Sequence, residues 1–558
     1  MHSKFISRII QLAPLMVAGM VVVTFCLGIL VPIYSDEVAI HMSRARFFLE
    51  DGQLVNLFSQ CNSNVTMSVP LTWYPAAMFY GLLFSAPGWI SLRLTGIVIG
   101  LVWLYLLWFW IGKLAQGSAS KNVLRALAFS FNGLGVLPFV LILARSEQIL
   151  ILCLVVYCLF SIYWQIEEYE RPILKVTKLV IFISLTSIFY YTHPKAIFFF
   201  PFVMVSAFLI FKKINWPIKI SVLILTGLMT FQAIWQAQAI SECREAPILA
   251  RALSQNTIDF HQLAENKTGF YLNAWSNIRH SLGSVLDRLS FVADYQSDWL
   301  PHAEDHKVGA GIVMLNAVIQ KSLFLCVIGM LFVFAVQLSR QLADRHIRPH
   351  TLLASVLVFG LLVHGLIYKP DTWHFYTPGL IVPVIILIFL LVLPTNSSPG
   401  KSIKLAGYVF VGYWMFLAVI SMSTLLYLML PHFIKIIHND NYAISEQPLS
   451  TPTFISKVRR NELSGLANKC NIDTNNAERL VLDTATYFAF KNNKQPINIL
   501  YVSDYGFGMD IGNNIGAYLN RMNSGGIIAK CAFLPEVIQK DAVRSGEMCC
   551  VSKASWLK

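Results

Sequence analysis

Charged residues are scarce in this chain. Asp, Glu, Lys and Arg make up 13% of its 558 residues, whereas hydrophobic residues make up 56%. A soluble globular protein carries about a quarter charged residues, so this chain has too few charges to cover a water-facing surface of its size. The scarcity excludes an ordinary soluble protein. Together with repeated apolar runs long enough to cross a bilayer, it indicates an integral membrane protein.

Signals that would indicate other kinds of site are also missing. The sequence has no Cys-x-x-Cys pair and no Cys/His spacing typical of a metal site. The net charge is +13, yet the basic residues form no basic and aromatic patch of the kind that binds nucleic acid. The preference of Lys and Arg for the cytoplasmic side of membranes explains the excess. We therefore expect the lipid bilayer as a partner, and neither nucleic acid nor a metal cofactor.

The apolar runs predict about eleven transmembrane helices. The first run follows Lys4 and Arg8, and it is longer than the apolar core of a signal peptide. No small-residue cleavage site follows it, so we interpret it as a retained helix. The predicted spans are 11–33, 89–112, 126–144, 148–165, 179–192, 196–211, 220–240, 309–337, 351–368, 376–394 and 405–430.

The basic residues predict the orientation. They gather in alternate short connections, near Lys113, Arg171, Lys212 and Arg340, and such connections stay in the cytoplasm. We therefore predict a bacterial inner-membrane protein with a cytoplasmic N-terminus and a periplasmic C-terminus. The predicted outer face receives the loops 34–88 and 241–308, the short turns at Arg145, His193 and Lys369, and the tail 431–558.

The tail differs in composition from the rest and predicts a small extracytoplasmic α/β domain, 431–558, beside a transmembrane domain, 1–430. Its pattern predicts a helix over Glu478–Phe490, a strand over Ile497–Val502 and a helix over Ile511–Met522 ended by Gly525 and Gly526. Six cysteines lie on the predicted outer side, where disulfides persist. Six cysteines allow fifteen pairings, and the sequence alone assigns none of them. They are Cys61, Cys243, Cys470, Cys531, Cys549 and Cys550.

Two adjacent carboxylates follow the first apolar run. Asp36 and Glu37 end the stretch Pro32-Ile-Tyr-Ser-Asp-Glu, at the predicted outer surface of the membrane. Loss of hydration raises the pKa of a carboxylate toward the range useful for a general base. On this interpretation Asp36 is a general base that removes a proton. Ser35 followed by two acidic residues is equally typical of a helix start, and that alternative stays open.

Cationic and hydrogen-bonding side chains occupy the other predicted outer turns. Such groups bind the phosphate of a lipid-linked donor and stabilise it as a leaving group. Each turn also has a simpler interpretation, since Lys and Arg extend toward water at a membrane surface and aromatic residues form an interfacial belt. The candidates for substrate binding are Arg93, Arg145, Glu147, His193, Lys195, Lys369, His374 and Tyr376.

The acidic pair in Tyr34-Ser-Asp-Glu-Val-Ala, followed by a predicted interfacial helix, resembles the first outer loop of the GT-C superfamily of membrane glycosyltransferases. An Arg that starts the second span is common there, and Arg93 is similar. The Thr192-His-Pro-Lys turn and the His374-Phe-Tyr-Thr-Pro segment resemble donor-phosphate regions of the protein mannosyltransferase and aminoarabinose transferase branches. The O-antigen glucosyltransferases are a further bacterial branch that looks similar. The resemblance covers the topology of 1–430 and not the tail.

The resemblance implies a polytopic α-helical fold of GT-C type and an inverting sugar transfer from a polyprenyl-phosphate donor. The implied acceptor is a cell-envelope glycan or glycolipid, such as the O-antigen of lipopolysaccharide. Asp36 is the implied base, with Glu37 as its helper or as a ligand of the acceptor. Branches that use monophosphate donors generally need no metal. Oligosaccharyltransferases of the superfamily use a divalent metal, which Asp36, Glu37 and Glu147 would bind in that less favoured case. A small flippase and a polyprenyl-phosphate sugar synthase are expected in the same pathway.

Other functions stay open at this stage. A transporter or flippase of lipid-linked sugars commonly has repeated halves or ionisable groups at mid-membrane, and we find neither pattern in the sequence. An O-antigen polymerase or ligase is expected to depend on basic residues in a large outer loop, and the loop 241–308 contains Arg244, Arg251, Arg279 and Arg288. A receptor or assembly scaffold built around the tail is the non-enzymatic alternative.

Overall fold

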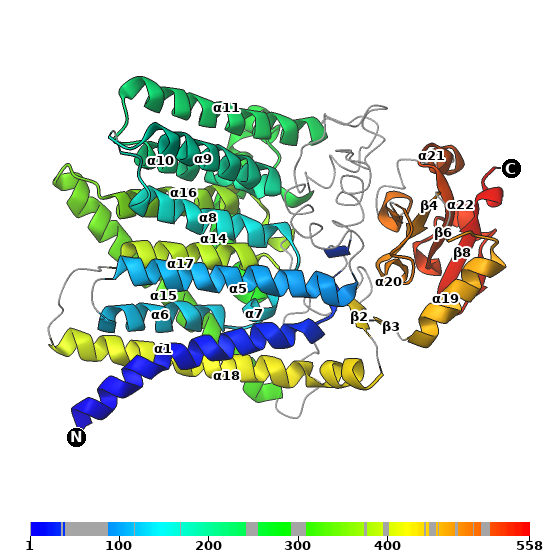
Figure 1. The fold of residues 1–558 in the computed structure, drawn as a ribbon, viewed down its shortest axis with the longest axis horizontal. Helices are drawn as coiled ribbons and strands as arrows, with labels where there is room; N and C mark the ends of the chain where they lie inside the picture. Colours follow the sequence, from blue (N-terminus) through cyan, green and yellow to red (C-terminus); the bar gives the residue numbers. More distant parts are fainter. Residues whose placement is uncertain are drawn as a thin grey trace.

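The computed structural model describes most of the chain, with its termini at the places marked in Figure 1. Asp36 and His374 lie outside the described residues, as do Cys61, Cys243 and most of the predicted outer loop 34–88. The described residues are 2–34, 37–38, 88–115, 118–167, 169–241, 255–291, 309–372, 376–393, 401–439, 442–445, 453–455, 457–474, 478–494, 496–503 and 514–557.

Long apolar helices run side by side and form a bundle, which the tail adjoins at one end (Figure 1). Eight helices in the described part are long and apolar enough to cross a membrane. The protein is therefore a polytopic helical protein embedded in a membrane. The eight helices are α1 (His2–Leu27), α5 (Trp89–Leu114), α8 (Ser146–Tyr163), α9 (Pro172–Thr192), α11 (Trp216–Ser241), α15 (Gly309–Ala343), α16 (Pro349–Ile367) and α18 (Lys401–Asn439).

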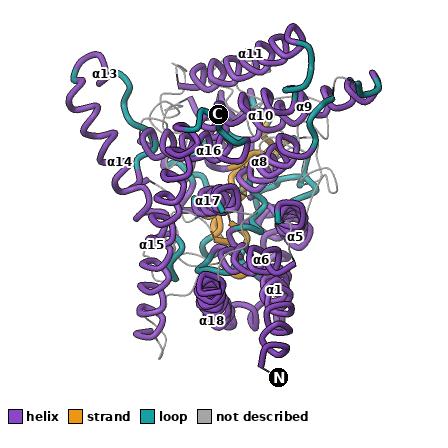
Figure 2. The backbone as a smooth tube through the Cα atoms, turned by 90° about the vertical axis from the view of Figure 1, so that its left-hand side faces the viewer, coloured by secondary structure: helices purple, strands orange, loops and turns teal. Residues whose placement is uncertain are grey.

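Three further predicted spans correspond to shorter helices. The 3-10 helix η3 (Pro194–Phe199) continues into α10 (Phe200–Ile210), and α17 (Pro378–Val392) has nearly every side chain buried. Figure 2 places α17 in the middle of the bundle, so protein rather than lipid surrounds it. The third, predicted over 126–144, begins in α6 (Ser118–Asn132). The predicted number of eleven spans therefore stays a prediction.

The segment 126–144 is not the continuous helix that its apolar pattern predicts. α6 ends at Asn132, and Gly135 has a φ of +54°, in the left-handed region that favours glycine. A Cβ built on Gly135 would lie 2.0 Å from the carbonyl oxygen of Leu289. The chain then makes one helical turn, α7 (Leu137–Val140), before it reaches α8. The close approach of a neighbouring backbone therefore explains both the glycine and the break.

The backbone groups released by this break are hydrogen-bonded inside the protein. The N–H of Gly135 donates to Oγ of Ser421 at 2.7 Å, and the N–H of Val136 donates to the carbonyl of Leu289 at 3.1 Å. Non-helical backbone is tolerated at membrane depth where protein, rather than lipid, surrounds it. The break thus brings an irregular stretch of backbone, residues 141–145, into the interior of the bundle.

Part of the predicted outer loop 241–308 is helical and packs on the end of α16. It contains α13 (Gln262–Glu265) and α14 (Lys267–Arg288). Nδ2 of Asn277 donates to the carbonyl of Leu366 at 3.1 Å, and an isolated antiparallel bridge joins Thr257 to Tyr368. The outer connection is therefore fixed against the helix end that leads to Lys369.

A three-stranded sheet joins the first helix to the start of the tail. β1 (Ile33–Tyr34) pairs in parallel with β2 (Tyr442–Ser445), and β2 pairs in antiparallel fashion with β3 (Thr453–Ile455). β1 immediately precedes the acidic pair, and β2 follows α18. The segment that leads to Asp36 is therefore hydrogen-bonded to the chain that leaves the bundle for the tail. α18 itself ends at Asn439, beyond the predicted domain boundary at 430.

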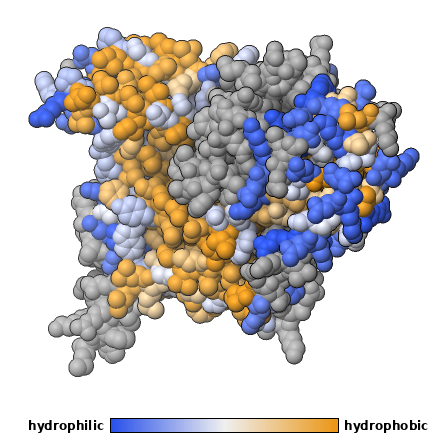
Figure 3. Space-filling view, turned by 45° about the vertical axis from the view of Figure 1, so that its right-hand side comes forward, coloured by the Kyte–Doolittle hydropathy of each residue, from blue (hydrophilic) through white to orange (hydrophobic). Residues whose placement is uncertain are grey.

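The tail contains a mixed five-stranded sheet in the order β5-β4-β6-β8-β7. β4 pairs in parallel with β5 and β6, and β8 pairs in antiparallel fashion with β6 and β7. In Figure 3 hydrophilic side chains gather over this side of the molecule, and hydrophobic ones cover the bundle. The elements are α19 (Lys457–Lys469), β4 (Arg479–Leu482), α20 (Thr484–Tyr487), β5 (Ile497–Asn498), η7 (Ile499–Tyr501), α21 (Ile515–Arg521), β6 (Ser524–Lys530), η10 (Cys531–Phe533), α22 (Glu536–Gln539), β7 (Val543–Ser545), β8 (Met548–Ser552) and η11 (Lys553–Ser555).

Two local predictions for the tail are wrong. The helix expected over Glu478–Phe490 is replaced by the central strand β4 and the short helix α20. Leu480, Val481 and Leu482 are all buried, as is typical of a strand covered on both faces. Gly525 and Gly526 do not end a helix but lie inside β6. A short apolar run fits either element, and the neighbouring parallel strands decide between them.

Two disulfides stabilise the tail. Cys470 pairs with Cys550, which ties the end of α19 to β8, and Cys531 pairs with Cys549. Disulfides persist in oxidising compartments, which agrees with the predicted outer location of the tail.

We predict that Gly135→Ala destabilises the protein by about 1–3 kcal/mol or more, because the new Cβ meets the carbonyl of Leu289 and the residue has a positive φ. Gly227→Ala in α11 is the matched control, since a Cβ there meets no atom within 4 Å. The control is expected to be as stable as the wild type or slightly more stable. Thermal unfolding of both purified variants in detergent checks this, and equal losses would contradict it.

Candidate functional site

A buried ion pair fixes the segment after the first helix. Glu37 accepts two hydrogen bonds from the Arg93 guanidinium, Oε1 from Nη1 at 3.0 Å and Oε2 from Nη2 at 2.9 Å. Both side chains are 0% exposed. Arg93 lies in the second turn of α5 and reaches the carbonyls of Pro32 at 2.8 Å and Ile142 at 3.2 Å. The pair therefore connects three separate segments of the chain.

Backbone donors complete the environment of Glu37. The N–H of Tyr34 donates to Oε2 at 2.9 Å, and the N–H of Ala144 donates to Oε1 at 2.6 Å. A carboxylate has about four lone-pair sites, and these four donors use them all. Glu37 and Arg93 thus hold the segment at Tyr34 in place relative to α5. The catalytic role of Glu37 and the substrate-binding role of Arg93 stay predictions.

A second cluster lies next to this pair, with cations gathered around Glu147. Nε of Arg145 is 3.3 Å from Oε2 of Glu147, Nζ of Lys195 is 3.4 Å from Oε1, and Nε2 of His193 is 3.6 Å from Oε1. Glu147 is 1% exposed, and its three partners are all buried. Three of the predicted substrate-binding residues thus meet around a fourth, Glu147.

Two interruptions of helical structure place these side chains. Arg145 is the residue before α8, at the end of the irregular stretch 141–145, and Glu147 lies in the first turn of α8. His193 separates α9 from η3 in an extended conformation, and its Nδ1 accepts a hydrogen bond from the N–H of Lys195 at 3.0 Å. Pro194 begins η3, and proline cannot continue α9 because it lacks a backbone N–H.

Aromatic rings surround the cations. The Arg145 guanidinium carbon lies 3.5 Å from the centre of the Tyr376 ring and 5.7 Å from that of Tyr34. Nζ of Lys195 lies 5.8 Å from the ring centres of both Tyr368 and Tyr376. Contacts of a cation with an aromatic face are favourable, and more so when water is excluded. The rings thus help to stabilise Arg145 and Lys195, two cations that share the single carboxylate of Glu147.

The two clusters form one site because they share the same segments. Tyr34 donates its N–H to Glu37, and its ring centre lies 6.0 Å from that of Tyr376. Ala144 bonds to Glu37, and the next residue, Arg145, pairs with Glu147. The site lies where α1 and α9 end and α5 and α8 begin, at the end of the bundle that faces the tail (Figure 1).

The electrostatics of the site favour an anion. Arg145 and Lys195 stand against one carboxylate, so the described cations exceed the described carboxylates here, and His193, whose Nδ1 accepts a hydrogen bond, is a neutral imidazole in this arrangement. Burial and, to a smaller extent, the negative charge of Glu147 raise the pKa of Tyr368 to about 12, so this phenol stays protonated at neutral pH. A phosphate is the natural ligand for Lys, Arg and His side chains next to a phenol donor.

The remaining predicted residues are less central. The backbone N–H of Lys369 donates to the carbonyl of Asn256 at 2.9 Å, which places it beside the Thr257–Tyr368 bridge. Asp36 and His374 fall outside the described residues. The substrate-binding roles of Arg145, Glu147, His193, Lys195, Lys369, His374 and Tyr376 and the catalytic role of Asp36 stay predictions.

Two tyrosine rings and several backbone groups of this site could not be identified from the sequence. Tyr34 and Tyr368 flank predicted site residues, and their apolar-aromatic surroundings look like an interfacial belt. The backbone groups of Pro32, Ile142 and Ala144 have no signal in the sequence. The unusual pair Gly133 and Gly135 is the one available sign that the helix breaks and sends backbone toward the site.

No metal site is evident in the part of the chain that the structure describes, where no group of three or more His, Cys, Asp or Glu is placed to hold an ion. Glu37 and Glu147, two of the three carboxylates considered for a metal, are each paired with cations. Such paired carboxylates are a poor donor set for a divalent ion.

Comparison with known proteins gives no family for the chain. No protein-family model and no curated protein sequence matches it. The function must therefore be argued from the site itself.

We predict that Arg93→Met destabilises the protein by about 3–5 kcal/mol, because it leaves the Glu37 carboxylate buried without its counter-charge. Lys213→Met is the matched control. It breaks the Lys213–Glu167 pair, whose side chains are 53% and 64% exposed, and is expected to cost less than about 1 kcal/mol. The double variant Arg93→Met/Glu37→Met should recover part of the loss. Denaturant unfolding measures all three, and equal effects of the two single variants would refute the positioning role.

Proposed function

We propose that this protein is a membrane glycosyltransferase of GT-C type that moves a sugar from a polyprenyl-phosphate donor to a cell-envelope glycan or glycolipid on the outer face. The observation that carries this proposal is the buried cluster of Arg145, His193 and Lys195 around Glu147. The cluster adjoins the segment that bears Asp36. It supplies a binding place for an anion at the end of a membrane bundle, where the phosphate of a lipid-linked donor lies.

The cation cluster can stabilise the donor phosphate both when the donor binds and when the phosphate leaves. The donor phosphate carries negative charge when bound, and it gains further charge as the bond from sugar to phosphate breaks. Preorganised cations in a water-excluded site stabilise such developing charge more strongly than water does. The rings of Tyr34, Tyr368 and Tyr376 exclude water from Arg145 and Lys195.

Asp36 is the proposed general base. Glu37, its neighbour in the sequence, is fixed by four hydrogen bonds, and Tyr34 on the other side is fixed by β1 and by its bond to Glu37. The proposed reaction forms a bond from an acceptor hydroxyl oxygen to the anomeric carbon and breaks the bond from that carbon to the phosphate oxygen. The hydroxyl proton passes to Asp36, and polyprenyl phosphate leaves with inversion at the anomeric carbon.

The proposal includes the orientation and the pathway. Basic residues near the ends of α5, α9 and α15 opposite the tail support a cytoplasmic position for that end, and the disulfides of the tail support a periplasmic position for the other. We propose a bacterial inner membrane, about eleven spans, and the tail as a separate outer domain. A small flippase and a polyprenyl-phosphate sugar synthase supply the donor in this scheme.

We predict that Asp36→Asn abolishes transfer, lowering its rate about 100-fold or more, because the amide cannot accept the hydroxyl proton. Asp259→Asn, an exposed aspartate next to α13, is the matched control and should keep full activity. The assay uses purified full-length protein in liposomes with labelled polyprenyl-phosphate sugars and envelope glycolipid acceptors. Full activity of Asp36→Asn would rule out the general base.

The same assay separates the alternative functions. A flippase would move labelled lipid across the liposome without forming a glycosylated product. An O-antigen polymerase or ligase would require a pyrophosphate-linked donor and would ignore the monophosphate. Either result would refute the transfer that we propose.

We predict that Lys195→Met weakens the binding of the donor, because a charge-assisted hydrogen bond to phosphate is worth about 1.5–3 kcal/mol, or about 10–100-fold in affinity. Lys213→Met is again the control, since Lys213 lies exposed and pairs with Glu167 away from the site. Steady-state kinetics should give a higher KM for the donor with an unchanged KM for the acceptor. A change in the acceptor KM alone would contradict phosphate binding by Lys195.

A further inference from the structure

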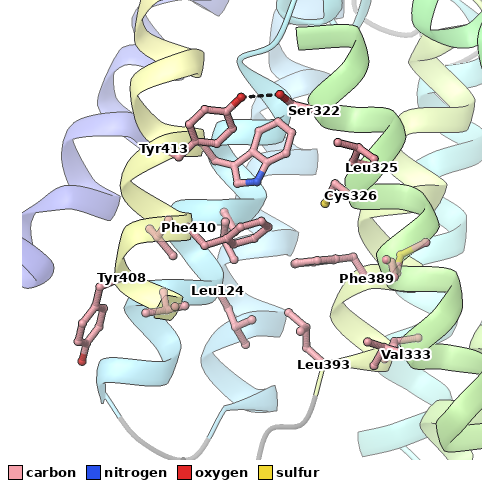
Figure 4. A pocket seen from close by; sticks show the side chains of 18 of the residues that line it. Leu124, Ser322, Leu325, Cys326, Val333, Phe389, Leu393, Tyr408, Phe410 and Tyr413 are labelled. Atoms are coloured by element: carbon pink, nitrogen blue, oxygen red, sulfur yellow. Dashed lines mark hydrogen bonds between the residues drawn. The ribbon is translucent and has the colours of Figure 1, made fainter. Parts of the chain in front are cut away.

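An apolar cavity lies in the half of the bundle that points away from the tail. It has a volume of about 830 Å³ and opens between α15 and α18, with α6 and the end of α17 behind it (Figure 4). Phe389, Leu393, Phe410 and Val333 are among the side chains that line it. Its size is in the range of cavities that hold small ligands. No residue of the cation cluster around Glu147 lines it.

The cavity matches the depth of one membrane leaflet. Along α15 it extends from Ser322 to Val333, which is about 16 Å at the rise of an α-helix. Half of the hydrocarbon core of a bilayer is about 15 Å thick. It is lined by Ser120 near the start of α6 and by Gly407 near the start of α18. The cavity therefore lies in the part of the bundle away from the tail, over a length close to the thickness of one leaflet.

A hydrogen bond lies at the end of the cavity nearer the tail. The hydroxyls of Ser322 and Tyr413 bond across the gap between α15 and α18, above the apolar side chains in Figure 4. A lipid of the leaflet opposite to the tail enters from the surface and does not meet this bond.

Basic side chains lie near the open end. Lys121 is one turn before Leu124 on the same face of α6, and Leu124 lines the cavity. Arg340 is two turns beyond Val333 on the same face of α15, and its side chain is exposed. Lys and Arg at this level attract the anionic head groups of lipids.

From these observations we propose that the cavity is a binding site for one anionic phospholipid of the leaflet opposite to the tail. One acyl chain fills the space between α15 and α18, and the head group lies near Lys121 and Arg340. The inference depends on the membrane location of the bundle and not on sugar transfer, so either proposal can fail while the other stands.

Gly329 gives a direct test, because it lines the cavity and a Cβ there meets no atom within 4 Å. Gly329→Phe should fill the cavity without displacing its walls. Gly227→Phe in α11 is the matched control, at a glycine with equal room that does not line the cavity. Gly407→Phe is a second cavity variant in case the first does not fold.

The experiment reconstitutes the full chain with phosphatidylglycerol or phosphatidylcholine, extracts it into mild detergent and counts the retained lipids by native mass spectrometry. Wild type and Gly227→Phe should retain one phosphatidylglycerol, and Gly329→Phe or Gly407→Phe should lose it. Lys121→Gln and Arg340→Gln should each weaken retention about fivefold for phosphatidylglycerol and leave phosphatidylcholine unaffected.

Three outcomes would overturn the proposal. Equal retention by wild type and both cavity variants would show that the lipid lies elsewhere. Equal retention of phosphatidylcholine and phosphatidylglycerol would refute the anionic head group. Displacement of the bound phospholipid by added polyprenyl phosphate, with the same loss in Gly329→Phe, would assign the cavity to the isoprenoid chain of a donor instead.

Discussion

The ion pair between Glu37 and Arg93 is the interaction on which the rest of the site depends. Moving two charges out of water is costly, and this pair offsets the cost through a bidentate contact and through backbone donors and acceptors. Those backbone groups come from Pro32, Tyr34, Ile142 and Ala144. A pair that needs all of them is stable in one arrangement of the chain. It therefore fixes the end of the first helix, α5 and the irregular stretch before α8 relative to one another.

The break in the helix after α6 supplies backbone groups that bond to this ion pair. A regular helix uses its own carbonyls and N–H groups internally, so it cannot offer them to a neighbouring side chain. The break at Gly135 releases the backbone of residues 141–145, and the released groups bond to Arg93 and Glu37. It also turns Arg145 toward Glu147 and Tyr376. Irregular backbone in the bundle is thus the means by which distant segments make one polar site.

Much of the bundle was predictable from the sequence, because each spanning helix must itself be long and apolar enough to cross the bilayer. The turns at Arg145 and His193 were predictable as well, and the structure brings them together with Tyr376. Other features depend on neighbours that no local pattern reveals. The partner of Glu37 is 56 residues away along the chain, the break at Gly135 exists because Leu289 approaches it, and Arg479–Leu482 is a strand because parallel strands flank it.

The pairing of β1 with β2 has a consequence for the assembly of the protein. Ile33 lies opposite Ile444, so the strand that leads to the acidic pair meets its partner only after about 400 more residues have been made. At about 5–20 residues per second, roughly 20–80 seconds of synthesis separate the two strands. During that interval all of the intervening helices must enter the membrane. The polar end of the bundle is therefore completed last, and a chain that stops before α18 lacks the strand that holds its first outer segment in place.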